Sequence, residues 1–162
     1  MGVEYKTDSI RGIKLQKMGI TPPSDWNDVE QVRAVKILEM GATCTDTIYG
    51  GIETGGKRYS LTAYDQTELM AQLSIVKEGA AAVPYHANGE LCRMFPAAEF
   101  LAVAQEATEF IMYHRTYCNH LNAWIRRAEL EELSAITYGA DLPKDLAKSM
   151  KNLLVSASGG DV

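Results

Sequence analysis

The longest regular pattern of apolar residues in the chain lies between residues 96 and 128. Apolar side chains recur there every three or four positions, which is the period of an α-helix. No glycine interrupts the run, and Pro96 suits the first helical turn because its missing N–H costs nothing there. The pattern predicts one long amphipathic helix over 96–128. At 1.5 Å per residue it would be ~50 Å long, which is more than a compact domain needs.

Three adjacent heptad positions of this helix are almost entirely apolar. They are Phe100, Ala107, His114, Leu121 and Ala128, then Val103, Phe110, Tyr117 and Trp124, then Ala104, Ile111, Cys118 and Ile125. A face this broad is wider than a two-stranded coiled-coil seam and must be covered on two sides. Either helices of the same chain cover all of it, or part of it meets the same helix in other subunits.

The second alternative predicts an interface on this helix. Tyrosine and tryptophan are enriched at binding hot spots, and a polar residue inside an apolar stripe can set the register between helices. The candidate interface residues are Phe110, Tyr113, His114, Tyr117, Leu121 and Trp124. A lone histidine in such a stripe is more often a hydrogen-bonded core residue than a ligand or a pH switch.

Glycine-containing turns predict two β-hairpins before the long helix. Gly55-Gly56 and Asn88-Gly89 each separate two short runs that favour strands, and these pairs supply the positive φ angles of tight turns. We therefore expect hairpins over 52–61 and 82–95. Pro84 has no backbone N–H to donate, so its strand should lie at a sheet edge.

Capping residues predict the shorter helices. Ser24 or Asp25 suits the N-cap of the first, and Thr62 with Asp65 forms a weak capping box for the second. The expected helices cover 25–49, 63–78, 130–137 and 142–156. The pattern as a whole predicts an α+β, mostly helical fold: two short β-hairpins with a long C-terminal amphipathic helix and following short helices.

The chain length fits a single domain with short flanks. Residues 24–157 are expected to form that domain. Residues 1–23, which end in a double proline, are expected to be an N-terminal arm or a docking segment, with a short extended stretch around Ile10 to Leu15. The glycine-rich end over 158–162 should fray.

Charge and composition argue against several classes of partner. The 162 residues carry 16 Lys and Arg against 21 Asp and Glu, and no basic run exceeds Arg126-Arg127, so nucleic acid and anionic membrane surfaces are not expected partners. No apolar run approaches the ~20 residues that span a bilayer. The 3 cysteines are odd in number and widely spaced, which favours reduced thiols in a cytoplasm.

The sequence contains none of three common catalytic motifs. There is no GxSxG, P-loop or HExxH pattern. Cys118 and His120 lie on different helix faces, and with His86 and Cys92 they form none of the spacings of a metal site. We therefore expect no enzyme activity, no cofactor, no metal and no small-molecule substrate.

Several segments resemble a domain of unknown function that is common in the tail modules of bacteriophages. The residues that carry the resemblance are Cys44, Ile48, Gly50, Tyr59, Ser60, Leu61, Asp65, Gln66, Ile125, Ala128 and Leu130. It covers about 40–140, and Thr67-Glu68 stand near a position where many relatives have asparagine. The resemblance implies a virion component or an assembly helper, and it transfers no catalytic or ligand-binding residue.

The resulting hypothesis is a non-enzymatic structural or assembly protein of a tailed bacteriophage, acting by protein–protein contacts near the tail fibre or tail tip. Its expected partners are copies of itself, other phage tail proteins, or both. It would be made in the host bacterial cytoplasm and, as a tail component, be carried in the virion. The alternative is a phage accessory protein that binds and inhibits a host factor.

Overall fold

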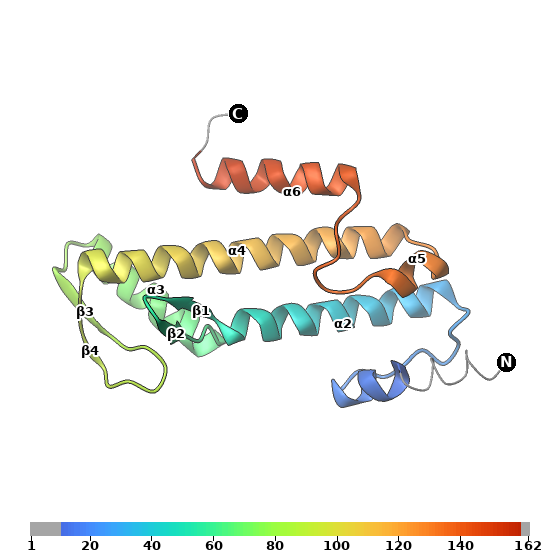
Figure 1. Cartoon of the computed structure of the whole chain (residues 1–162), viewed down its shortest axis with the longest axis horizontal. Coiled ribbons are helices and arrows are strands. Elements are labelled where there is room, and N and C mark those ends of the chain that lie inside the picture. Colours follow the sequence, from blue (N-terminus) through green and yellow to red (C-terminus); the bar gives the residue numbers. More distant parts are fainter. Residues whose placement is uncertain (1–10, 160–162) are drawn as a thin grey trace. The chain divides into compact units, whose positions relative to one another are not determined.

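The computed structural model describes residues 11–159, which fold as two compact units. Unit 1 takes in the chain up to Cys44 and again from Thr116, and unit 2 is the continuous segment Thr45–Arg115. Figure 1 shows the elements in chain order: α2 (Val29–Gly50), β1 (Ile52–Thr54), β2 (Lys57–Tyr59), α3 (Ala63–Lys77), β3 (Ala82–Tyr85), β4 (Arg93–Pro96), α4 (Ala97–Arg127), α5 (Leu130–Ala135) and α6 (Lys144–Ala157). Helices α2 and α4 each contribute residues to both units.

The predicted fold class is confirmed: the described chain is α+β and mostly helical, with two antiparallel two-stranded sheets. The long helix α4 begins one residue after Pro96, which ends β4. Among the residues described, no helix combines the length and the apolar character needed to cross a membrane.

The hairpin β1–β2 has the tight glycine turn that its sequence predicts. Ile52 pairs with Tyr59 and Thr54 with Lys57, and both turn glycines have positive φ, +59° at Gly55 and +74° at Gly56. A glycine is also needed just before this hairpin. Gly51 has φ +77°, and a Cβ atom there would lie 1.8 Å from the carbonyl oxygen of Tyr59.

The hairpin β3–β4 is wider than the Asn88-Gly89 pair predicts. Val83 pairs with Phe95, but the strands end at Tyr85 and resume only at Arg93. The reason is that Asn88 bonds to the first hairpin. Its backbone N–H donates to the carbonyl of Arg58 (2.9 Å), and its side-chain oxygen accepts from the Ser60 amide (3.0 Å).

Unit 2 has an aromatic core. The Tyr85 ring packs edge-on against Phe95 and Phe100, with centroids 5.8 and 5.4 Å apart, and lies parallel to Tyr59 at 6.2 Å. All four side chains are at least 96% buried, with exposed fractions of 0–4%. Burial raises the pKa of the Tyr85 phenol to about 12. Edge-to-face pairs of this kind stabilise a core beyond the area that they bury.

Unit 1 has a mainly aliphatic core. Helix α4 contributes Tyr117, Leu121 and Ile125 to it, and the other members come from α2, the α5 region and α6. The buried residues of this core are Val32, Met40, Tyr117, Leu121, Ile125, Ala128, Leu133, Ile136 and Met150. The chain's own helices therefore cover the C-terminal part of the apolar face of α4, which is the first of the two alternatives raised above.

Two local predictions at the start of the chain were wrong. Residues 11–17 form a short helix, with Leu15 buried, where an extended stretch was expected. Helix α2 begins at Val29 and not at residue 25, because Asp28 is its cap: its carboxylate accepts from the amides of Glu30 (3.0 Å) and Gln31 (3.3 Å).

The side chains that were expected to cap α2 are used otherwise. The Asp25 carboxylate accepts from the Asn27 amide in a local turn (2.9 Å), and Ser24 donates to Gln31 (2.8 Å). The other predicted helix bounds lie close to the observed ones. Residues 1–10 of the predicted arm and 160–162 of the predicted tail lie outside the described part of the chain.

Candidate functional site

A closed polar network holds the start of α3. One oxygen of the Asp65 carboxylate accepts from the Ser60 hydroxyl (2.8 Å), the Thr62 amide (2.9 Å) and the Thr62 hydroxyl (2.7 Å). The Asp65 amide donates back to the Thr62 hydroxyl oxygen (3.2 Å), so the predicted capping box is confirmed. We call Ser60, Thr62 and Asp65 the α3 cap network.

The charge of Asp65 is stabilised by these donors. Burial acts to raise the pKa of its carboxyl, but the hydrogen bonds from Thr62 and Ser60 outweigh burial and lower the pKa. The next side chain, Gln66, donates to the Leu61 carbonyl (2.8 Å). Ser60, Asp65 and Gln66 belong to the residues that resemble phage tail-module proteins. Their hydrogen bonds join β2 to α3.

The predicted interface residues of α4 fall into two sets. Tyr117 and Leu121 are buried in the unit 1 core, with exposed fractions of 7% and 0%. The Tyr117 hydroxyl donates to the carbonyl of Ala140 (2.7 Å) and accepts from the amide of Gly139 (3.0 Å). Trp124 is half-buried, and its indole N–H donates to Glu132 (2.6 Å). These residues hold the end of α4 against the α5 region.

The other three predicted residues form an exposed group in unit 2, which we call the α4 aromatic cluster: Phe110, Tyr113 and His114. The ring of His114 packs edge-on against Phe110 (4.5 Å between centroids) and against Tyr113 (5.2 Å). Tyr113 is 47% exposed, and the other two are half-buried. Burial lowers the pKa of the His114 imidazole and so favours the uncharged form of that side chain.

Unit 1 also contains a pocket of about 790 Å³ that is open to solvent. The pocket lies among the helix over 11–17, α2 and the α5 region. Its floor is apolar, and its most deeply buried members are Leu15, Val32, Met40, Leu133 and Ile136, each less than 10% exposed. Trp26 and Tyr138 contribute half-buried aromatic rings to the lining.

Charged groups gather on one side of this pocket. The Lys36 ammonium donates to the carbonyl oxygen of Ile136 (3.0 Å) and lies 3.7 Å from the Glu39 carboxylate. Lys14 approaches the same carboxylate at 3.6 Å. The side chains of Lys36 and Glu39 are only 16% and 15% exposed. Burial lowers the pKa of the Lys36 ammonium. The negative charge of Glu39 raises this pKa, whereas the positive charges of Arg11 and Lys14 lower it further.

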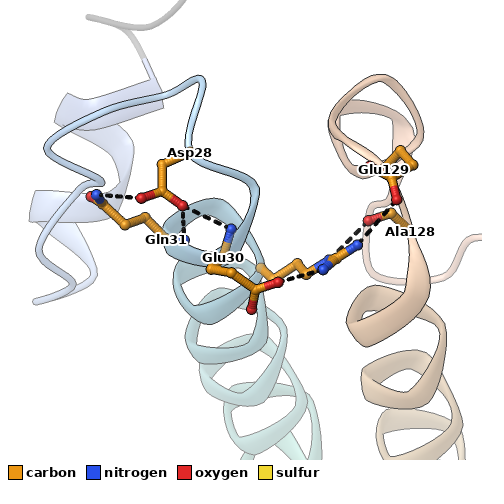
Figure 2. A network of polar contacts seen from close by, with 6 residues as sticks. Asp28, Glu30, Gln31, Ala128 and Glu129 are labelled. Atoms are coloured by element: carbon orange, nitrogen blue, oxygen red, sulfur yellow. Dashed lines mark hydrogen bonds and ion pairs between the residues drawn. The ribbon is translucent and has the colours of Figure 1, made fainter.

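A second polar network fixes the α4–α5 corner next to the pocket. Arg33 of α2 donates through Nε to the Ala128 carbonyl (3.0 Å), and its two terminal nitrogens reach Glu30 (2.6 Å) and Glu129 (3.4 Å). Figure 2 shows these contacts together with the Asp28 cap at the start of α2. Because Leu130 and Leu133 line the pocket, this corner sets the position of one of its walls.

The family described as "Domain of unknown function (DUF4376)" matches residues 31–140, which is more than half of the chain. The chain belongs to this family. The matched segment includes the α3 cap network and the α4 aromatic cluster, but not the helix over 11–17 or α6. Neither the curated proteins nor the solved structures contain a significant match to the chain.

The pocket is the feature that the sequence did not reveal. Lys36 and Glu39 stand three apart on α2, a spacing typical of an exposed ion pair on a helix. Nothing local indicates that Leu133 and Ile136 approach from the other end of the chain. Among the described residues, no group of three or more His, Cys, Asp or Glu side chains could hold a metal ion.

Proposed function

We propose that this chain is a non-enzymatic structural or assembly protein of a tailed bacteriophage, which acts by protein–protein contacts near the tail fibre or tail tip. The observation that carries the protein–protein part is the exposed α4 aromatic cluster. The resemblance of the segments around Ser60, Asp65 and Ile125 to phage tail-module proteins supports the phage part.

Within the α4 aromatic cluster, His114 interrupts a heptad position whose other members are buried. Ala107 and Leu121, which precede and follow His114 at the same heptad position, are both 0% exposed. His114 lies between them and is only half-buried, and the neighbouring Tyr113 is 47% exposed. Half-exposed aromatic side chains that already pack against one another lose little freedom on binding, which suits an anchor for a partner.

Polar groups that could act as acids or bases are engaged in structural contacts. One oxygen of the Asp65 carboxylate accepts three hydrogen bonds in the α3 cap network. His120 is 6% exposed, and its two ring nitrogens lie 2.8 Å from the Thr116 carbonyl and 3.1 Å from the Ser149 hydroxyl. This use of polar side chains supports a role in assembly over a role in catalysis.

Mass spectrometry of purified particles tests the phage part. The phage or prophage that encodes the chain would be propagated, and particles and cell lysate would be quantified separately for this protein. A tail component should be found in particles, in a fixed ratio to other tail proteins. An assembly helper should be missing from particles but should purify from the lysate together with tail proteins.

The contradicting result is equally specific. If the chain is missing from particles and purifies from the lysate only with a host protein, the proposal is wrong. The alternative of an accessory protein that binds a host factor would then account for the data.

A further inference from the structure

The pocket of unit 1 has the size of a small-molecule site, and its lining combines apolar and polar residues in similar measure. Its volume of about 790 Å³ falls within the range of ~300–1,000 Å³ that is usual for ligand pockets. Such pockets combine a mostly apolar lining with a few polar groups that orient the ligand. Here Leu15, Val32 and Met40 provide apolar floor, and Lys36 and Glu39 provide the polar end.

The charge at the polar end is unbalanced. Two ammonium groups, those of Lys14 and Lys36, share the single carboxylate of Glu39, at 3.6 and 3.7 Å. An ammonium has three N–H donors, and among the described residues Lys36 uses one on the Ile136 carbonyl and directs one toward Glu39. The Lys36 side chain is only 16% exposed, so water compensates its charge poorly. An added anionic group would complete this arrangement.

We propose that the pocket binds a small amphiphilic carboxylate, in which one carboxylate group ends an apolar chain of medium length. The carboxylate lies beside Lys36 and Lys14, and the apolar chain lies along the half-buried side chains of Val35 and Leu130. Trp26 and Tyr138 flank the chain. This inference is independent of the proposed function and assigns a ligand, not a substrate.

The lining of the pocket combines residues from inside and outside the segment that matches the family. Lys14, Leu15 and Trp26 precede the segment that matches the family, whereas Lys36 and Glu39 lie inside it.

Titration of the full chain with decanoate, below its micelle concentration, tests the proposal. Isothermal calorimetry should show saturable binding of decanoate, and amide shifts in the nuclear magnetic resonance spectrum should change around Trp26, Lys36 and Ile136. Decanol, which has the same apolar chain and no charge, should bind about tenfold more weakly, because it cannot compensate the ammonium groups. Decylamine, with a positive group, should not bind measurably.

Two variants test the contribution of the ligand's charged end separately from that of its apolar chain. Lys36→Met keeps the length of the side chain and should weaken decanoate about tenfold while leaving decanol unchanged. Val35→Phe places a larger ring in the lining and should weaken both compounds. Lys151→Met, at an exposed lysine of α6, is the matched control and should change neither.

The proposal is overturned by any of three results: no saturable binding of decanoate, decanol binding as tightly as decanoate, or equal affinities in Lys36→Met and Lys151→Met. If Lys36→Met does not fold, as judged by circular dichroism, Lys14→Met serves in its place. Lys14 is 71% exposed, and its substitution should weaken decanoate about threefold. An unchanged affinity in that variant contradicts the proposal in the same way.

Discussion

Both β-hairpins lie in unit 2, whereas the described part of unit 1 has helices and no strands, and the two units are built from the sequence in different ways. Unit 2 is one continuous segment whose hairpins and α3 are fixed by turns and caps only a few residues long. Unit 1 joins two segments from opposite ends of the chain: Arg33 donates to Ala128 across 95 residues, and Lys36 donates to Ile136 across 100. The difference shows why local signals specify one unit, whereas long-range packing specifies the other.

The largest effects are expected from the two cores. Phe95→Ala in unit 2 should lower the free energy of unfolding by ~3–5 kcal/mol, because a ring that is 1% exposed leaves a cavity. Leu133→Ala in unit 1 should lower it by ~2–5 kcal/mol. Hydrogen exchange by mass spectrometry should locate the first loss of protection in 45–115 and the second in 11–44 and 116–159. If each variant loosened both regions equally, the division into two units would be wrong.

Adjacent glycines in unit 2 should respond in opposite ways. Gly51→Ala should destabilise the chain by at least ~1–3 kcal/mol, because φ is +77° and the new Cβ would collide with the Tyr59 carbonyl. Gly50→Ala has open space around the new Cβ and lies in the last turn of α2, so it should be neutral or stabilise by up to ~1 kcal/mol. Thermal unfolding of both variants measures the contrast. Equal melting temperatures would contradict this account of the turn.

The α3 cap network should contribute less than either core. Asp65→Ala removes the acceptor of the Ser60 and Thr62 donors and should cost ~1–2 kcal/mol in urea unfolding. Asp46→Ala, at an exposed residue of α2 in the same unit, is the matched control and should stay within ~0.5 kcal/mol of the parent. A cost at Asp65 no larger than the control would mean that other contacts define the start of α3.

The smallest effect is expected from acid acting on unit 1. Arg127 binds Asp145 of α6 with two hydrogen bonds of 2.7 Å, and these bonds lower the pKa of Asp145 from 3.8 to about 2. A depressed pKa means that the contribution of the pair is present above pH 3.8 and is lost as pH falls through about 2. Amide shifts of α6 should therefore change over this window, and Asp145→Asn should abolish that change. A change that persisted in the variant would assign the acid response to another group.

The sequence predicted most of unit 2 because its signals are local. Gly55-Gly56 and the Thr62 capping box each act within a few residues, so the hairpin and α3 follow directly from them. The second hairpin was predicted too tight because Asn88 bonds to Arg58 and Ser60, far from its own turn.

The candidate site was predictable only in part. Heptad spacing and the enrichment of tyrosine at binding hot spots indicated the α4 residues, but neither could show that Tyr117 and Leu121 are covered while Tyr113 stays exposed. Burial along an apolar stripe depends on what packs against it, and the covering residues of unit 1 come from distant parts of the chain. The pocket around Lys36 was missed for the same reason.

The most direct test of a role in protein–protein contacts is sedimentation velocity of the purified chain over a range of concentrations. We predict that the parent chain self-associates and that Tyr113→Glu weakens the association at least tenfold, because it places a charge in the α4 aromatic cluster. Tyr64→Glu, at a tyrosine of α3 that is 78% exposed, should leave it unchanged. A parent chain that is strictly monomeric, or equal effects of the two substitutions, would contradict the account.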